Sequence, residues 1–374
     1  MRITDVTVTL WRWEDIPPTR YTRAVASSVS RTAKMGLVRI DTDEDVAGFA
    51  FIGSSYAPAD RDASFVVERL KPMLTGEDPL ARERLWNAMM TRTGGHTGGQ
   101  MFRAIGAVDV ALWDLAGRST GLPIHRLMGS CRDRVPAYAS SAVLESPQAY
   151  AEEALAHKES GWSAYKIHPP AIPELDIEIC RAVRDAVGED FRLMLDSTWS
   201  YDYPQALRVG RAIQDLDFYW YEDPLADDDL YGYVKLKQVL QIPIMATELP
   251  TAGPTSYAPW IMNRATDYLR GDVAIKGGLT GCLKTAHLAE AFRMNYEIHH
   301  GGNSLNNVAN LHLTMAISNC EYFEVLLPPR AQKHGLVRDI EVDGDGMVHV
   351  LDGPGLGAEI DFELIAARQT AVLR

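Results

Sequence analysis

The 374-residue sequence has only four cysteines, and their positions fit neither a disulfide framework nor a zinc site. Cys131, Cys180, Cys282 and Cys320 lie far apart, and no two of them form a CxxC pair. Scattered, reduced thiols are typical of cytoplasmic proteins. We therefore expect a cytoplasmic protein whose fold is held by its core rather than by cross-links.

Long apolar runs and basic clusters are also absent. No run of about 18 apolar residues occurs, which argues against a transmembrane helix, and the segment MRITDVTVTLWRWED alternates like a strand rather than a signal peptide. Lysine and arginine number 37 against 50 acidic residues, a formal net charge of −13. Without a basic block, the chain is not expected to bind nucleic acid or a membrane. A small anionic substrate stays open, because a metal or a few cations can reverse the local field.

The composition that is present, 46% hydrophobic and 23% charged, is typical of a globular chain of about two domains. Three strands are predicted first, over ITDVTVTLWRW, MGLVRIDT and VAGFAFIG. Between residues 63 and 121 the apolar period becomes helical. The chain therefore opens with an α+β unit.

From residue 135 onward, short apolar strands alternate with amphipathic helices. The eight expected strands are VPAYAS, AYKIH, RLMLD, FYWYE, PIMATE, DVAI, MNYEIH and CEYFEV. Strict alternation indicates parallel β/α units, and eight such units predict a closed (β/α) barrel. The turn-rich tail, with DGPGLGAEID, is expected to return to the first unit.

Ionisable residues stand at the carboxyl ends of seven consecutive expected strands. They are Lys166 and His168, Asp196, Glu222, Glu248, Asp272, His299 and Glu324. The strand ends of a β/α barrel converge on one mouth, where barrel enzymes carry out their chemistry. We therefore expect these side chains to share one site.

Three carboxylates from successive strands, those of Asp196, Glu222 and Glu248, would repel one another unless a cation lay among them. An oxygen-only set with room for water suits Mg²⁺, which is the expected cofactor. The alternative is that each carboxylate caps a helix or forms an ion pair.

The remaining residues suit acid–base chemistry at a carbon next to a carboxylate. Asp272 can orient His299 as a base, and the neighbouring His300 is the alternative working residue. Lys166, in AYKIHPP, can stabilise negative charge on the substrate carboxylate, with His168 on the same strand face as a second base. Glu324 is expected to be protonated by anionic crowding and to donate to the other carboxylate oxygen.

These residues, together with AVDVALWDLAGRSTGLPIHRLMG and IKGGLTG, make the chain resemble the enolase superfamily, specifically its mandelate racemase-like subgroup. The resemblance implies an N-terminal capping domain over 1–125, a barrel over 126–345 and a segment over 346–374 that returns to the cap. It also implies Mg²⁺ on the three carboxylates, a His299 base oriented by Asp272, and a homo-oligomer. The chain departs from the common Lys-x-Lys pattern in having His168 at the second position.

The resemblance implies a dehydratase of a sugar acid, either an aldonate or an aldarate, that forms a 2-keto-3-deoxy acid. A racemase or epimerase of a 2-hydroxy acid uses the same residues, and a non-catalytic protein that binds a metal or a sugar acid is the alternative of another class. Cycloisomerase and dipeptide epimerase are disfavoured, because relatives with those activities resemble a pattern with lysines on both barrel sides. The expected substrate-binding residues lie in loops of the cap: Arg20, Arg23, Arg31 and Tyr56. TRTGGHTGGQ is expected near the mouth.

Overall fold

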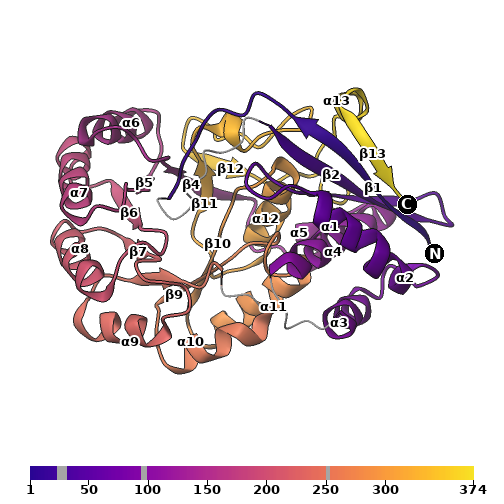
Figure 1. Cartoon of the computed structure of the whole chain (residues 1–374), viewed down its shortest axis with the longest axis horizontal. Helices are drawn as coiled ribbons and strands as arrows, with labels where there is room; N and C mark the ends of the chain where they lie inside the picture. The colour runs from indigo at the N-terminus through magenta and orange to yellow at the C-terminus, as the bar shows by residue number, and fades with distance from the viewer. Residues whose placement is uncertain (23–31, 94–98, 250–252) are drawn as a thin grey trace.

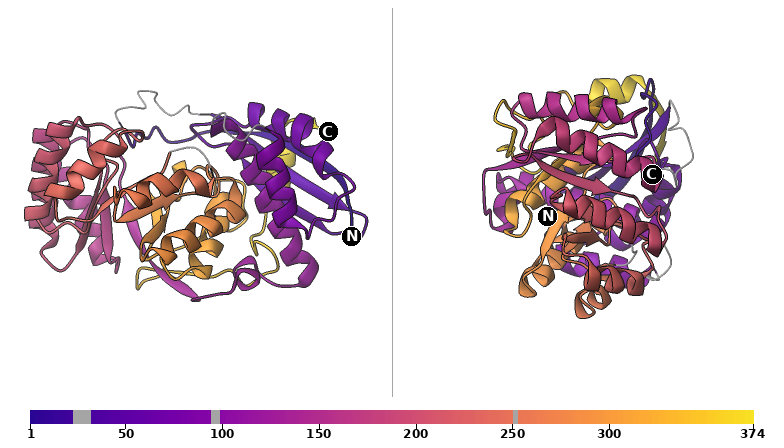
Figure 2. Two further views of the ribbon diagram at one scale, coloured as in Figure 1. Left: turned by 90° about the horizontal axis from the view of Figure 1, so that it is seen from below. Right: turned by 90° about the vertical axis from the view of Figure 1, so that its left-hand side faces the viewer.

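The computed structural model describes residues 1–22, 32–93, 99–249 and 253–374, and it contains a small antiparallel sheet beside a larger parallel one (Figure 1). The small sheet has the order β13-β1-β2-β3. Its strands are β1 (Ile3–Trp13), β2 (Ala33–Thr42), β3 (Ala47–Ile52) and β13 (Gln369–Leu373). Because β13 pairs with β1, the C-terminus returns to the N-terminal unit, and both termini lie on that side of the molecule (Figures 1 and 2).

Helices cover one face of this sheet. They are α1 (Asp60–Phe65), the π-helical turn η1 (Val66–Leu70), α2 (Lys71–Leu74), α3 (Arg82–Arg92) and α4 (Gly99–Thr120). Helix α4 lies directly on β3, where a Cβ at Gly48 would come within 2.1 Å of the Ala111 carbonyl oxygen. The backbone N–H of Phe49 donates to the buried Asp114 carboxylate at 2.9 Å. Glycine is therefore required at the point where helix and strand touch.

The parallel array supplies the second unit. It runs β4 (Arg134–Ser140), α6 (Pro147–Glu159), β5 (Ala164–Ile167), α7 (Pro173–Val187), β6 (Arg192–Asp196), α8 (Tyr203–Asp215), β7 (Trp220–Glu222), α9 (Leu230–Val239), β8 (Ile244–Ala246), α10 (Ala258–Met262), β9 (Tyr268–Gly271), α11 (Gly278–Ala291), β10 (Asn295–Ile298), α12 (Ser304–Ala316) and β11 (Phe323–Leu326). Helix α5 (Ile124–Met128) links the two units, and β12 (Met347–His349) pairs with β4. Short 3₁₀ turns are η2 (Pro254–Tyr257) and η3 (Pro329–Ala331).

Parallel pairing runs in the order β10-β9-β8-β7-β6-β5-β4-β11, which is a nearly closed barrel. Among the described strands, β10 and β11 form no ladder. Side chains join them instead: the Glu324 carboxylate accepts from the His300 N–H at 3.2 Å, and Glu297 accepts from the Glu321 N–H at 3.1 Å. The prediction of a (β/α) barrel with an α+β cap is confirmed.

One expected strand is wrong. The sixth barrel strand is Tyr268–Gly271, while DVAI forms the turn that follows it. The Asp272 carboxylate accepts from the Ala274 N–H at 2.8 Å, and the Asp272 carbonyl accepts from Ile275 and Lys276. This turn competes with strand extension, although valine and isoleucine favour strands.

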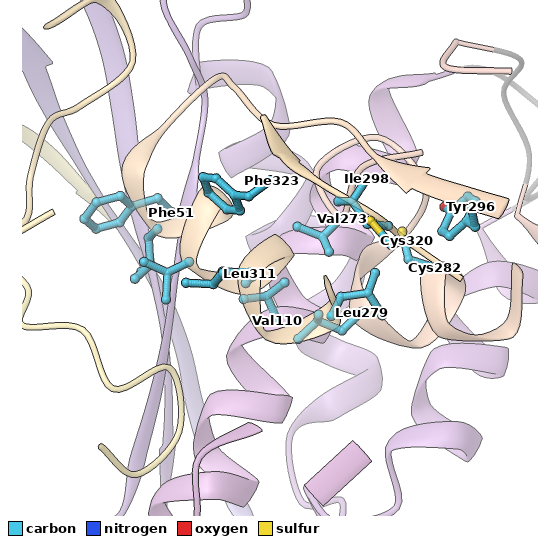
Figure 3. Close-up of a cluster of buried hydrophobic side chains, with 14 of the residues drawn as sticks. Phe51, Val110, Val273, Leu279, Cys282, Tyr296, Ile298, Leu311, Cys320 and Phe323 are labelled. Carbon is cyan, nitrogen blue, oxygen red and sulfur yellow. The ribbon is translucent and has the colours of Figure 1, made fainter. Parts of the chain in front are cut away.

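A shared apolar core joins the cap to the barrel (Figure 3). Phe51 of β3 and Val110 of α4 lie in the same cluster as Leu279 of α11 and Leu311 of α12. Hydrogen bonds also hold the cap against the barrel. Asp109 of α4 accepts from both the N–H and the hydroxyl of Thr280 in α11, at 2.8 and 2.7 Å. The cap therefore has a fixed position beside the strand ends. Within the described ranges, no helix has the length and apolar character needed to cross a bilayer.

Candidate active site

A cavity of about 590 Å³ lies where the cap meets the carboxyl ends of the barrel strands. Seven of the eight residues expected at the site line it: Lys166, His168, Asp196, Glu248, Asp272, His299 and Glu324. The eighth, Glu222, is fully buried and does not line the cavity. Loops of the cap form the opposite wall. The cavity is large enough for a small organic ligand.

Lys166 of β5 is fully buried among three carboxylates. Its Nζ lies 3.1 Å from Asp196 Oδ2, 2.9 Å from Glu222 Oε2 and 2.8 Å from Glu324 Oε1. Burial alone would lower the pKa of Lys166, but Glu222 and Glu324 outweigh burial and raise that pKa well above its usual value. The ammonium therefore stays charged and supplies fixed positive charge at the cavity floor.

His168 lies just beyond β5 and points to the same side as Lys166. Its Nδ1 lies 2.7 Å from the Ser141 carbonyl oxygen, and its Nε2 lies 3.1 Å from Asp196 Oδ2. The carbonyl oxygen accepts a hydrogen bond from Nδ1–H, which leaves Nε2 as the nitrogen that can exchange a proton in the cavity. The ring of Tyr21, from the cap, packs edge-on against the His168 ring, with the two ring centroids 5.4 Å apart.

Arg270 of β9 is a site residue that the sequence reading missed. Its guanidinium is fully buried, with Nε 2.8 Å from Glu222 Oε1 and Nη2 2.6 Å from Glu324 Oε2. The expected rise in the pKa of Glu324 is wrong: burial raises that pKa, but Arg270 and Lys166 hold it well below its usual range. Glu324 is therefore an anion here. The available signal was the arginine in YLRG, which lies just before the expected strand DVAI, so the misplaced strand left Arg270 outside the expected barrel.

An acidic cluster lies beside this network. Carboxylate oxygens of Glu222, Asp223 and Glu248 lie within 4.8 Å of one another, and both oxygens of fully buried Asp223 lack a hydrogen-bond partner. Burial, then Glu248, Asp196 and Glu222, raise the pKa of Asp223 well above its usual value. Buried, unpartnered carboxylates at this spacing fit a divalent cation with oxygen ligands. Asp223 was missed, although YEDP shows it next to Glu222.

Asp196 borders the cluster from β6. Its Oδ1 accepts from the Thr198 N–H at 2.9 Å, while Oδ2 faces Lys166 and His168. Burial opposes ionisation, but Lys166 and His168 lower the pKa of Asp196. Asp196 and Glu248 reach the cavity, whereas Glu222 and Asp223 lie behind it.

His299 and Asp272 form a pair on the other side of the cavity. His299 Nδ1 lies 2.9 Å from Asp272 Oδ2, and Asn310 donates to Asp272 Oδ1 at 3.0 Å. Burial disfavours the imidazolium, but Glu248, the hydrogen bond to Asp272 and the Glu324 charge raise the pKa of His299 to about 9. Nε2, 3.7 Å from Glu248 Oε1, is the nitrogen left for a substrate.

His300, the alternative working residue, does not line this cavity. Its ring is buried against Phe323 with centroids 3.9 Å apart, and burial lowers its pKa to about 3. Of the cap residues expected to meet substrate, Arg20 and Tyr56 line the cavity. Arg23, Arg31 and residues 94–98 of TRTGGHTGGQ lie outside the described residues. Arg103 of α4 lines the cavity and was not anticipated.

Fold and site together define a capped (β/α) barrel with acidic groups and two histidines at the strand ends. Residues 5–129 match the family model of the mandelate racemase / muconate lactonizing enzyme N-terminal domain, and residues 149–364 match the enolase C-terminal domain-like family. The chain therefore belongs to the enolase superfamily, in its mandelate racemase-like group.

Named relatives are similar over most of the chain. Arabinonate dehydratase of Saccharolobus solfataricus is 28% identical, over 93% of this chain and 94% of that protein. D-galactarolactone cycloisomerase of Agrobacterium fabrum is 28% identical, over 88% and 89%. The crystal structure of D-glucarate dehydratase from Agrobacterium tumefaciens, complexed with magnesium, has a TM-score of 0.88 and 33% identity, covering 99% of this chain and all of that one. Because one of these relatives is a cycloisomerase, similarity to the named proteins does not by itself exclude cycloisomerisation, the reaction that the sequence analysis disfavoured.

Proposed function

We propose that the chain is a Mg²⁺-dependent dehydratase of a sugar acid, which removes the proton next to the carboxylate and expels the 3-hydroxyl to give a 2-keto-3-deoxy acid. The observation that carries this proposal is the pair of histidines, His168 and His299, that reach one cavity from different strands with a buried lysine between carboxylates beneath them. The named dehydratase relatives support it.

The acidic cluster is the proposed metal site. Asp196, Glu222 and Glu248 would hold the cation, because Asp196 and Glu248 reach the cavity where a substrate would lie, and Asp223 would add negative charge from behind. When bound, Mg²⁺ would supply positive charge beside the substrate carboxylate.

The two histidines are assigned different tasks. His168 takes the proton from C2, since the Ser141 carbonyl holds its Nδ1 and its Nε2, 3.1 Å from Asp196 Oδ2, is the nitrogen left to accept a proton. Lys166 contacts the same Asp196 oxygen, so its charge is close enough to stabilise the negative charge that develops. His299 is protonated at neutral pH because its pKa is about 9, so it donates a proton to the departing 3-hydroxyl. The carboxylate of Asp272 holds the imidazolium in place.

The direct test is a screen of the purified protein with Mg²⁺ against mono- and diacid sugars, following 2-keto acid formation. The proposal expects one acid, or a few related ones, to give a keto product that chelation abolishes. Absence of any keto product across the screen would contradict it.

A racemase or epimerase is the second candidate, and the same two histidines favour it, because bases on two sides of one carbon can exchange its proton. Running the screen in D₂O separates the two reactions. Deuterium at C2 of recovered substrate, without keto product, identifies racemisation.

A further inference from the structure

The cap wall of the cavity carries cationic side chains and no acidic one among the described residues. All four carboxylates that line the cavity belong to the barrel: Asp196, Glu248, Asp272 and Glu324. The cap contributes Arg20 and Arg103, together with hydroxyl-bearing and small residues. The cavity is therefore polarised, with its acidic groups at the barrel end and its guanidinium groups at the cap end.

Arg103 is anchored in a way that leaves most of its donors unused. Its Nε donates to Asp62 Oδ2 at 2.8 Å, and Asp62, a residue of α1, is fully buried. The two Nη groups of Arg103 have no hydrogen-bond partner among the described residues. The side chain is 33% exposed, and that exposed part faces the cavity.

A guanidinium held at Nε presents its Nη edge as a fork, which matches the two oxygens of a carboxylate. Lys166 does not lie at the cap end: its ammonium is held on the barrel side by Asp196, Glu222 and Glu324, where the reacting carboxylate of the substrate is placed. Arg103 is thus the anchored cation of the cavity with donors to spare.

We propose that Arg103 binds the distal carboxylate of the substrate, so that the enzyme acts on dicarboxylic sugar acids and discriminates against the matching monoacids. This inference rests on the proposed dehydratase function. It assigns one carboxylate to the barrel end, where Lys166 lies, and the other to the cap end. A monoacid would leave the Nη edge facing a neutral hydroxymethyl group.

The test compares matched acids that differ only at C6, such as D-glucarate with D-gluconate and galactarate with galactonate. The wild-type kcat/KM is expected to favour the best diacid over its monoacid. Arg103→Gln should lower kcat/KM for the diacid by about 10- to 100-fold, since hydrogen bonds between charged groups contribute about that much, and should change the monoacid value little. Equal losses for both acids, or a wild-type preference for monoacids, would overturn the inference.

Loss of Arg103 also leaves Asp62 buried without its cation, so stability needs its own control. In Asp62→Asn/Arg103→Gln the unpaired charge is removed, and the loss of diacid preference should persist. Asp62→Asn alone keeps the guanidinium, so it should keep the preference. If the double variant regains wild-type preference, Arg103 serves only to neutralise Asp62, and the inference fails.

Arg61→Gln is the control for loss of one positive charge. Arg61 is exposed on α1 and does not line the cavity, so this variant should leave kcat/KM for both the diacid and the monoacid unchanged.

A binding measurement separates this inference from the proposed function. Calorimetric titration of Mg²⁺-loaded protein with the same acid pairs needs no turnover. If the wild-type protein binds diacids more tightly than monoacids and Arg103→Gln abolishes this difference, the inference is supported. This holds even if no keto product forms, because a missing product counts only against the proposed dehydration. Diacid affinity that is unchanged in Arg103→Gln overturns the inference even if dehydration is found.

Discussion

The two sides of the cavity differ in how their charges are held. On one side Lys166 and Arg270 interlock with Glu222 and Glu324, and all four side chains are at most 2% exposed. On the other side His299 lies 2.9 Å from Asp272 Oδ2 and 3.7 Å from Glu248 Oε1, and its side chain is 22% exposed. On the first side Lys166 and Arg270 are held as cations, because burial is outweighed by their carboxylate partners, which raise the pKa of both well above the usual values, whereas the pKa of His299, about 9, lets the second side change protonation. A proton-transfer enzyme needs both properties, and here they are separated in space.

The largest predicted effect concerns the titrating side. His299→Asn should lower kcat for keto-acid formation by about 100- to 10,000-fold, the usual contribution of a general acid. The free energy of unfolding should also fall, because the imidazolium loses its contacts with Glu248 and Asp272, but by less than in a variant that leaves fully buried carboxylates without their cation. Steady-state kinetics and denaturant unfolding of the same sample check both halves. A loss of stability as large as that expected for Arg270→Met would contradict the difference proposed between the two sides.

Arg270→Met tests the interlocked side. It leaves the buried carboxylates of Glu222 and Glu324 without the guanidinium group that pairs with them, so we expect the free energy of unfolding to fall by about 3–5 kcal/mol. Arg192→Met is the comparison variant: Arg192 is half exposed, lies 3.9 Å from Glu321 and donates to the Tyr322 hydroxyl at 2.7 Å, and contacts of this kind contribute about 1 kcal/mol or less each. If the two variants unfold alike in urea, the buried network is not what stabilises this side.

Metal binding is expected to depend on both acidic residues that border the network. Asp223→Asn should weaken Mg²⁺ binding by about 10- to 100-fold, because Asp223 lies behind the proposed ligands. Asp196→Asn removes a proposed ligand and should weaken Mg²⁺ binding more than Asp223→Asn does. Isothermal titration of chelator-treated protein measures this. The reverse order would place Asp223, not Asp196, among the direct ligands.

The smallest predicted effect is on pH dependence. If His299 must be protonated, kcat should fall as pH rises through about 9, its raised pKa. The pairing contributes stability that is fully present below 6.5, the ordinary pKa, and is lost as pH rises through about 9. Asp272→Asn removes a group that raises this pKa, so the alkaline limb of the rate profile should move to lower pH. An unmoved limb would assign it to another group.

Sequence periodicity predicted the barrel and cap because apolar alternation determines which faces are buried. The strand-end position also brought Lys166, His168 and His299 to one cavity. Periodicity failed at DVAI, where hydrogen bonds that Asp272 accepts favour a turn over a strand of β-branched residues. Arg270 and Asp223 were missed because their roles come from contacts across strands, which one sequence does not display. The error over Glu324 followed directly, since its ionisation depends on Arg270.

The assignment of His168 as base and His299 as acid can be tested by exchange of the C2 proton in D₂O. His299→Asn is incubated with the acid that the wild-type protein dehydrates. We expect this variant to incorporate deuterium at C2 of unreacted substrate while keto-acid formation is lost. Loss of both activities together would show that His299 removes the C2 proton, and the two roles would then have to be reassigned.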